Sequence, residues 1–286
     1  MGRKLQKLFA ISKFVVMINF PGCKINLGLR ILRKRADGYH DIESVFFPVP
    51  LNDIVEVVKA PSNSPIVFSA SGLEIPGDIS ENLCVKAYHL LQSSYALSSV
   101  SIHLHKEIPM GAGLGGGSAD GTSTLFMLNE LFNLKLTDEK LEGFALQLGS
   151  DCPFFVKNQP ALVEGRGEKI KPVSLSLKGY FLVLINDGTH ISTQEAYAGV
   201  HPKEPDISLE KIIQLPVIEW KNKLINDFED TVFKKHQQLK EIKRQLYKKG
   251  AEYAAMTGSG STIFGLFKHK PSFEEPKSGF IKIIGL

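Results

Sequence analysis

Alternating hydrophobic and polar residues mark the first secondary-structure element of the chain. Ile25, Leu27, Leu29 and Ile31 alternate with small or polar residues, which is the two-residue period of a strand with one buried face. A turn sequence at 36–38 ends this unit. Similar runs predict further strands, and these lie at 44–49, 54–58, 66–69, 100–104, 161–163 and 180–185.

Apolar residues at helical spacing predict four helices. In the second of them, Leu125, Leu128 and Phe132 form an apolar stripe, and Thr137 is the expected cap of the third. Two strands should also flank the turn at 257–261. Strands dominate the first part and helices punctuate the later part, which predicts an α+β protein with two lobes. The expected helices are 82–95, about 118–132, one that follows Thr137, and about 228–249, which ends before Gly250.

The length of 286 residues is enough for two average domains. We expect an N-terminal domain at 17–172 and a C-terminal domain at 173–286. Residues 1–16 are expected to be a loose extension or a misassigned start, because the structured pattern opens at Met17. A signal peptide is the alternative for 1–16, but no small-residue cleavage site follows its short apolar stretch.

The formal charge of +4 is only mildly basic, and the basic residues are interleaved with acidic ones. This pattern favours anionic small molecules over nucleic acid. Cys23, Cys84 and Cys152 lie far apart, which indicates neither a disulfide framework nor a zinc site and suits the cytoplasm. No apolar run reaches the roughly 18 residues that cross a bilayer, so no membrane partner is expected. We expect a monomer or a weak homodimer.

Five glycines occur within seven residues of the segment PMGAGLGGGSADG at 109–121. Such a loop lets another group approach the backbone closely, whereas a plain flexible connector is the alternative. With Ser118 opening a helix, free N–H groups would point at one anion. The segment therefore predicts a nucleotide phosphate site, with the candidate residues Pro109, Gly111, Gly113, Leu114, Gly115, Gly116, Gly117 and Ser118.

Other phosphate-binding motifs fit this segment less well. Residues 111–116 match G-x-G-x-x-G, but Pro109 separates the loop from the preceding strand, and Asp138 lies at a helix start instead of a strand end. The P-loop pattern is absent because no Gly-Lys pair occurs. The protein-kinase motifs H-R-D and D-F-G are absent as well.

The order Pro109, Gly113, Leu114, Gly115, followed by small residues into a helix, resembles the phosphate loop of the GHMP kinases. The wider family usually has two serines where this chain has Gly116 and Gly117. That departure matches a branch whose substrate is a cytidine diphosphate sugar alcohol, and it leaves the role of Ser118 open. The resemblance covers nearly the whole chain from Met17.

This resemblance implies a two-lobed GHMP kinase fold. The N-terminal α/β lobe would resemble ribosomal protein S5 domain 2, the C-terminal α/β lobe would be ferredoxin-like, and the active site would lie between them. It also implies transfer of the γ-phosphate of ATP to a hydroxyl of the sugar alcohol, with Mg²⁺. The sequence does not identify the metal ligands.

Phosphoryl transfer needs an aimed hydroxyl and neutralised charge more than covalent chemistry. Asp151, in LGSDCPFF, is either a turn aspartate or a base, and Lys24, in PGCKINL, is either a solvated strand lysine or its partner. Both segments resemble the catalytic elements of the family, which implies that Asp151 is the general base and Lys24 its neighbour. Asn26 would share the face of Lys24 and could bind the substrate.

The segment RADGYH at 35–40 is either an ordinary hairpin or a substrate element. It resembles a signature of the cytidine branch, in which Tyr39 would stack on cytosine and His40 would read its polar edge. Tyr197 occupies the position of a second aromatic residue, and Thr193 could assist it. The segment TGSGS resembles a turn that closes over the phosphates, with Gly258 and Ser259 as candidates, although a plain hairpin is the equal alternative.

Two functions compete with this interpretation. One is a GHMP kinase of other specificity, which the RADGYH segment disfavours, and the other is a non-catalytic cytidine-nucleotide binding protein, which the presence of Lys24 and Asp151 disfavours. A dinucleotide-dependent oxidoreductase is a distant third. His103 and His105 have a spacing that occurs in metal sites but lack a third ligand nearby, so an exposed strand edge is the favoured interpretation.

Overall fold

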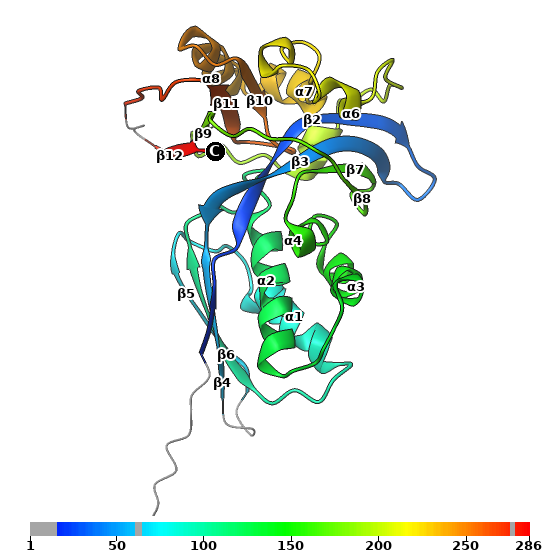
Figure 1. The fold of residues 1–286 in the computed structure, drawn as a ribbon, viewed down its shortest axis with the longest axis vertical. Coiled ribbons are helices and arrows are strands. Elements are labelled where there is room, and N and C mark those ends of the chain that lie inside the picture. Colours follow the sequence, from blue (N-terminus) through cyan, green and yellow to red (C-terminus); the bar gives the residue numbers. More distant parts are fainter. Residues whose placement is uncertain (1–15, 61–64, 275–277) are drawn as a thin grey trace, which may run out of the picture.

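The structure is a computed structural model that describes residues 16–60, 65–274 and 278–286. Within these residues it contains three four-stranded sheets with helices around them (Figure 1). Nearly all of the predicted extension at 1–16 lies outside the described residues, while Val16 begins the first strand. The proposed domain boundary at 172/173 falls between two of the sheets described below and stays a proposal.

The first sheet has the order β1-β4-β6-β5, and its strands are β1 (Val16–Asn19), β4 (Ile54–Lys59), β6 (Val100–Lys106) and β5 (Val67–Gly72). Only the β5–β6 pair is parallel. Helices α1 (Leu83–Gln92) and α2 (Gly116–Leu131) cover one face, where buried residues of β4 and β6 share a core with both helices. This packing fixes α2, whose first turn forms part of the site.

The second sheet has the order β2-β3-β7-β8, with β2 (Gly22–Lys34), β3 (His40–Asn52), β7 (Ala161–Gly165) and β8 (Lys169–Pro172). The third sheet has the order β10-β11-β9-β12, with β10 (Tyr253–Met256), β11 (Ile263–Phe267), β9 (Phe181–Asn186) and β12 (Phe280–Gly285). Both sheets are antiparallel throughout.

The long strands β2 and β3 join the two halves of the molecule (Figure 1). Ile25 and Leu27 on β2 and Val45 on β3 share a core with Leu184 on β9 and Phe264 on β11. Alternating residues of one strand pair are therefore buried against the C-terminal sheet. The predicted strands at 25–31, 44–49, 54–58, 66–69, 100–104, 161–163 and 180–185 are confirmed. Their ends agree to within two residues, except that β2 and β3 extend three or four residues further at both ends and β5 extends three residues further at its C-terminal end.

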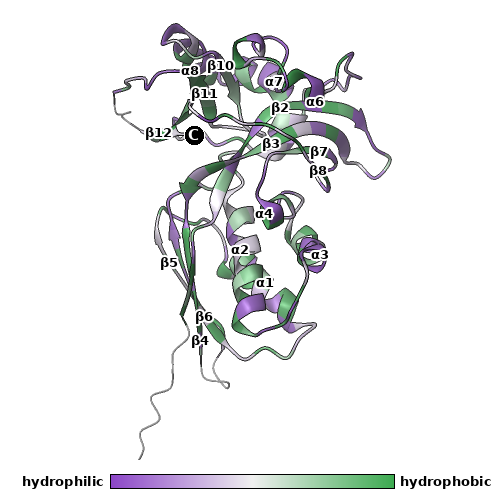
Figure 2. Ribbon diagram, in the orientation of Figure 1, coloured by the Kyte–Doolittle hydropathy of each residue, from purple (hydrophilic) through white to green (hydrophobic). Residues whose placement is uncertain are grey.

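The remaining helices surround this framework. Their bounds are η1 (Ile79–Glu81), α3 (Asp138–Leu148), α4 (Phe154–Lys157), α5 (Thr193–Tyr197), α6 (Leu209–Ile212), η2 (Val217–Glu219), α7 (Phe228–Lys235) and α8 (Gln237–Lys248). Helix α2 is buried on most sides, whereas α8 is largely hydrophilic and buries Leu239 and Leu246 (Figure 2). No helix in the described part of the chain is both long and apolar enough to cross a membrane.

Three expectations about these elements are wrong. The helix predicted at 228–249 is two helices, because His236 leaves the helical conformation (φ −119°, ψ 70°) and its ring lies 3.0 Å from the Glu195 carboxylate. Helix α2 begins at Gly116 instead of Ser118. His103 and His105 are not on a strand edge, because β6 lies between β4 and β5 and both rings hydrogen-bond to Ser71 on β5.

Candidate active site

Lys24 is a buried cation with a defined orientation. Its side chain is 4% exposed, and its Nζ atom lies 3.3 Å from the Asp151 carboxylate, whose side chain is 35% exposed. The same ammonium donates to Asn26 Oδ1 at 2.7 Å and lies above the Phe46 ring. A buried ammonium requires such partners. The two residues predicted to form the catalytic pair are therefore in contact, with the carboxylate on the solvent side.

Three distant segments meet beside Lys24. The Thr257 hydroxyl accepts a hydrogen bond from the Asn26 backbone N–H at 3.1 Å, and it can donate to the Gly113 carbonyl oxygen at 3.0 Å or to Asn26 Oδ1 at 3.1 Å. The Lys24 N–H donates to the Leu114 carbonyl oxygen at 2.9 Å. Asn26 also donates to Ser44 and is 1% exposed, so its predicted role as a substrate ligand stays a prediction.

Protein packing explains several of the loop glycines. A β-carbon added at Gly113 would lie 2.1 Å from the Thr257 carbonyl oxygen, and one added at Gly116 would lie 2.7 Å from Ile108. Gly115 has φ of +70°, and a β-carbon added there would lie 3.1 Å from Lys24 Cε. These positions require glycine even without a ligand.

The same segment also leaves a helix start free for an anion. No side chain caps α2, which begins immediately after Gly115. The first N–H groups of an uncapped helix attract anions. Ser118 lies in this turn and is half-buried, whereas the Leu114 side chain is buried in the core. Pro109, Gly111 and Gly117 are less enclosed, with Gly111 next to His190.

Two of the predicted aromatic residues, His40 and Tyr197, lie against each other. The rings of His40 and Tyr197 are stacked, with centroids 4.8 Å apart, and Tyr197 also contacts Phe228 edge-on. Burial, together with the negative charge of Asp151, raises the pKa of Tyr197. Tyr39 is 57% exposed, and Thr193, in the first turn of α5, is exposed too.

The turn at 257–261 connects β10 to β11 and lies against the loop at 109–115. Gly258 has φ of +57°, and a β-carbon there would lie 3.2 Å from Gly113. Its carbonyl oxygen accepts a hydrogen bond from Asn226 at 2.8 Å. Ser259 is half-buried in the same turn. The structure thus brings this turn to the glycine-rich loop, and the phosphate contacts predicted for Gly258 and Ser259 stay predictions.

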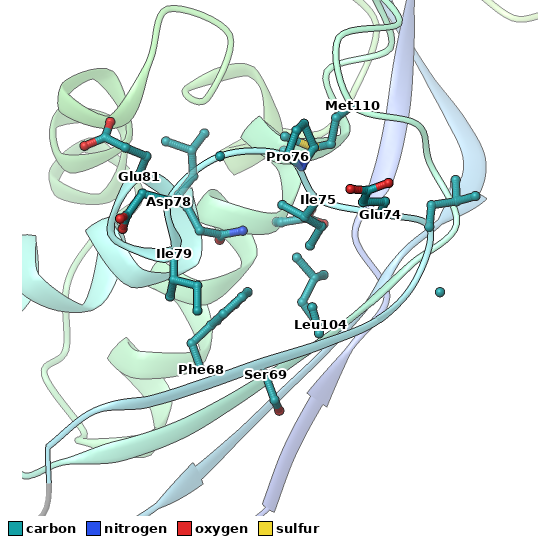
Figure 3. A pocket seen from close by; sticks show the side chains of 18 of the residues that line it. Phe68, Ser69, Glu74, Ile75, Pro76, Asp78, Ile79, Glu81, Leu104 and Met110 are labelled. Carbon is teal, nitrogen blue, oxygen red and sulfur yellow. The ribbon is translucent and has the colours of Figure 1, made fainter. Parts of the chain in front are cut away.

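A cavity of about 340 Å³ opens beside the start of α2 (Figure 3). Phe68, Ile75 and Leu104 supply an apolar lining, and Met110 lies at one end. The lining also includes Gly117 from the first turn of α2. An apolar cavity that adjoins an anion-binding helix start suits the base and phosphates of a nucleotide.

The chain matches known family models and related proteins. The model "GHMP kinases N terminal domain" matches residues 82–159, and "GHMP kinases C terminal" matches 189–276. A protein of Bacteroides fragilis strain YCH46 named 4-diphosphocytidyl-2-C-methyl-D-erythritol kinase is 54% identical over 88% of this chain and 92% of its own. The protein of that name from Porphyromonas gingivalis is 42% identical over 91% and 95%.

The chain belongs to the GHMP kinase family.

Solved structures agree with this family assignment. A crystal structure of 4-(cytidine 5'-diphospho)-2C-methyl-D-erythritol kinase matches with a TM-score of 0.72 and 31% identity, covering 87% of this chain and 90% of that chain. Mevalonate kinase of L. major shares the fold at a TM-score of 0.67 and 17% identity, covering 91% and 89%. The predicted α+β, two-lobed GHMP kinase fold is confirmed.

Sequence reasoning missed several residues of this GHMP kinase site. Thr257 directly precedes Gly258 and Ser259, the residues predicted from this turn. Its hydroxyl connects β2 to the glycine-rich loop. The cavity wall at 68–83 contains no motif, so only the fold reveals it. The sequence could have indicated Thr257, because it lies in the glycine-containing segment TGSGS. The apolar residues of the cavity wall follow no recognisable pattern.

A buried charge cluster lies beneath the glycine-rich loop of this GHMP kinase. Lys106 Nζ is hydrogen-bonded to Asp53 and lies 2.7 Å from Asp120, and all three residues are buried. Burial raises the pKa of Asp120 to about 7, with the nearby Asp53 carboxylate adding to the effect and Lys106 opposing it. One oxygen of Asp120 has no hydrogen-bond partner in the described structure, and the residue lines the cavity.

The residues fit Mg²⁺ only together with a nucleotide. Within the described ranges, no group of three or more His, Cys, Asp or Glu side chains is arranged to hold a metal ion. Mg²⁺ in phosphoryl-transfer sites commonly uses one or two carboxylates together with substrate phosphates. The part-exposed Asp151 carboxylate meets that requirement.

Gly113→Ala should destabilise the protein by about 1–3 kcal/mol and abolish activity, because the added methyl group collides with the Thr257 carbonyl and φ is +76° at this position. Thermal unfolding measures the change. Gly117→Ala is the matched control, since its added carbon meets only Met110 at 3.4 Å, and it should melt near the wild type. Equal melting of both variants would contradict the packing argument.

Asp120→Asn should gain stability relative to the wild type as the pH rises from 5 to 8. The folded protein holds a proton on Asp120 up to about pH 7, whereas the unfolded chain releases it near its ordinary value, so the wild type loses stability across this window. The asparagine has no proton to lose. The melting temperature of the variant minus that of the wild type should be several degrees higher at pH 8 than at pH 5. The same difference at both pH values would refute the assignment.

Proposed function

We propose that this chain transfers the γ-phosphate of ATP to the 2-hydroxyl of 4-diphosphocytidyl-2-C-methyl-D-erythritol, giving the 2-phosphate and ADP. This step belongs to the non-mevalonate route to isoprenoid precursors. The names of the relatives at 42% to 54% identity support the substrate. The family supports the use of ATP.

The contact between Lys24 and Asp151 is the observation that carries the catalytic part of this proposal. Asp151 accepts the proton of the attacking hydroxyl, and the Lys24 ammonium, 3.3 Å from that carboxylate, stabilises negative charge on the attacking oxygen. The protein contributes position and charge, which is the main requirement of phosphoryl transfer. The Asn26 and Gly113 oxygens hold the ammonium in place.

The nucleotide of ATP would occupy the cavity beside α2, with its phosphates at the start of that helix. Pro109, Gly111, Gly113, Leu114, Gly115, Gly116, Gly117 and Ser118 form or support this phosphate loop. Mg²⁺, when bound with the nucleotide, neutralises charge on the phosphates. Asp151 is the carboxylate that would help to hold the ion.

Cytosine recognition is assigned to Tyr39, His40 and Tyr197. Tyr39 stacks on the base, His40 reads its polar edge, and Tyr197 supplies a second aromatic face, with Thr193, Gly258 and Ser259 beside the substrate. The rings of His40 and Tyr197 contact each other. The base would lie between the Tyr39 and Tyr197 rings, with His40 at its polar edge.

We also propose that the protein works in the cytoplasm. The three cysteines are unpaired and buried, which suits a reducing compartment, the cytoplasm. A monomer or weak homodimer is sufficient for the reaction, because the groups assigned to catalysis come from one chain.

Purified protein with Mg²⁺ and ATP should release ADP with 4-diphosphocytidyl-2-C-methyl-D-erythritol and not with mevalonate, homoserine or galactose. A coupled ADP assay measures this. Turnover with one of the other acceptors would support kinase activity but contradict the proposed specificity for the cytidine substrate. No turnover with any acceptor would favour a cytidine-nucleotide binding protein.

Asp151→Asn should lower kcat by about 100-fold to 10,000-fold, because the amide cannot accept the hydroxyl proton. ATP affinity, measured by titration calorimetry without Mg²⁺, should change little. Glu142→Gln is the control, since this carboxylate pairs with Lys157 on the surface. Retained turnover in the Asp151 variant would remove this residue from the mechanism.

A further inference from the structure

Arg166 is an exposed arginine that the proposed mechanism does not use. It lies in the tight turn between β7 and β8, which Gly165 and Gly167 shape with φ of +72° and +120°. The Arg166 N–H donates to the Glu168 carboxylate at 2.5 Å, and the Gly167 N–H donates to the Glu164 carbonyl oxygen. These contacts hold the backbone of the turn and leave the Arg166 side chain free to project from it.

The turn lies between the two ends of the substrate site. At one end, the Arg166 guanidinium lies 4.6 Å from the centre of the Tyr39 ring. At the other end, a β-carbon at Gly167 would lie 3.2 Å from Ser150, the neighbour of Asp151 in the chain. Strand β7 pairs with β3 up to Ile42 and Gly165, which fixes this placement.

The guanidinium has donors to spare. Its recorded contact is with the Tyr39 ring, and no hydrogen bond or ion pair engages it within the described part of the chain. The Asp37 carboxylate is paired with Arg35, whose hydrogen bond is the main cause that lowers the pKa of Asp37, and the Arg166 charge adds to this without forming an ion pair in the described residues. An arginine offers five N–H donors in a planar fork that matches two phosphate oxygens. The stack on Tyr39 orients this fork while leaving its edges available.

We propose that Arg166 binds the diphosphate of the cytidine substrate and so positions the sugar alcohol at Asp151. This inference rests on the proposed function. In that substrate the diphosphate connects the cytidine to the sugar alcohol, so a molecule with its base at Tyr39 and its hydroxyl at Asp151 carries the diphosphate past the turn at 165–167. Arg166 is a positioning residue, because it contacts neither the hydroxyl nor the γ-phosphate.

Binding of cytidine and of CDP separates this role from simple support of Tyr39. In Arg166→Gln the affinity for CDP should fall at least about tenfold, while the affinity for cytidine should stay within about twofold of the wild type. Arg166→Lys should fall between the two, since lysine keeps the charge but not the fork. Lys169→Gln removes an exposed positive charge from the same hairpin and should change neither affinity.

Steady-state kinetics provide the second readout. Arg166→Gln should raise KM for 4-diphosphocytidyl-2-C-methyl-D-erythritol at least about tenfold and leave KM for ATP unchanged. Equal losses of cytidine and CDP affinity, or an unchanged CDP affinity, would overturn the role of Arg166 while an active wild type keeps the proposed function. A wild type that neither binds CDP nor phosphorylates the substrate would overturn both.

Discussion

The close approach of the Thr257 carbonyl oxygen to Gly113 is the contact on which the rest of the site depends. It brings the turn after β10 against the glycine-rich loop, and the Thr257 hydroxyl then connects that loop to Asn26. Asn26 in turn holds the Lys24 ammonium. A missing side chain at one position thus allows three segments, far apart in the sequence, to fix one buried cation.

Lys24 and Lys106 are both buried, but their carboxylate partners differ in exposure to solvent. Lys106 is enclosed by Asp53 and Asp120, both buried, so its charge is used within the protein. Among the described residues, the carboxylate partner of Lys24 is Asp151, which is part-exposed. Removing a buried charge from water needs compensation in both cases, but only the second arrangement leaves a carboxylate facing the solvent.

Local sequence patterns predicted most of the strands and the glycine-rich loop. The features that they missed depend on contacts between residues far apart in the sequence. Alternation identified the strands, and the glycine spacing identified the loop, because both signals lie within a few residues. The break at His236 depends on Glu195, some 40 residues away, so the helical period at 228–249 could not reveal it. The reason for glycine at position 113 lies at Thr257, and the cavity wall at 68–83 has no motif.

The shared strands β2 and β3 also determine the mechanics of the molecule. Their buried residues complete the core against the C-terminal sheet while the same strands carry Lys24 and Tyr39's neighbour His40. This shared core therefore belongs to neither half alone, and separating the gene at residue 172 would yield two fragments with exposed apolar faces. Moving the two halves apart would expose the core that β2 and β3 share with β9 and β11 to water, so the free energy of burying that core opposes such a motion.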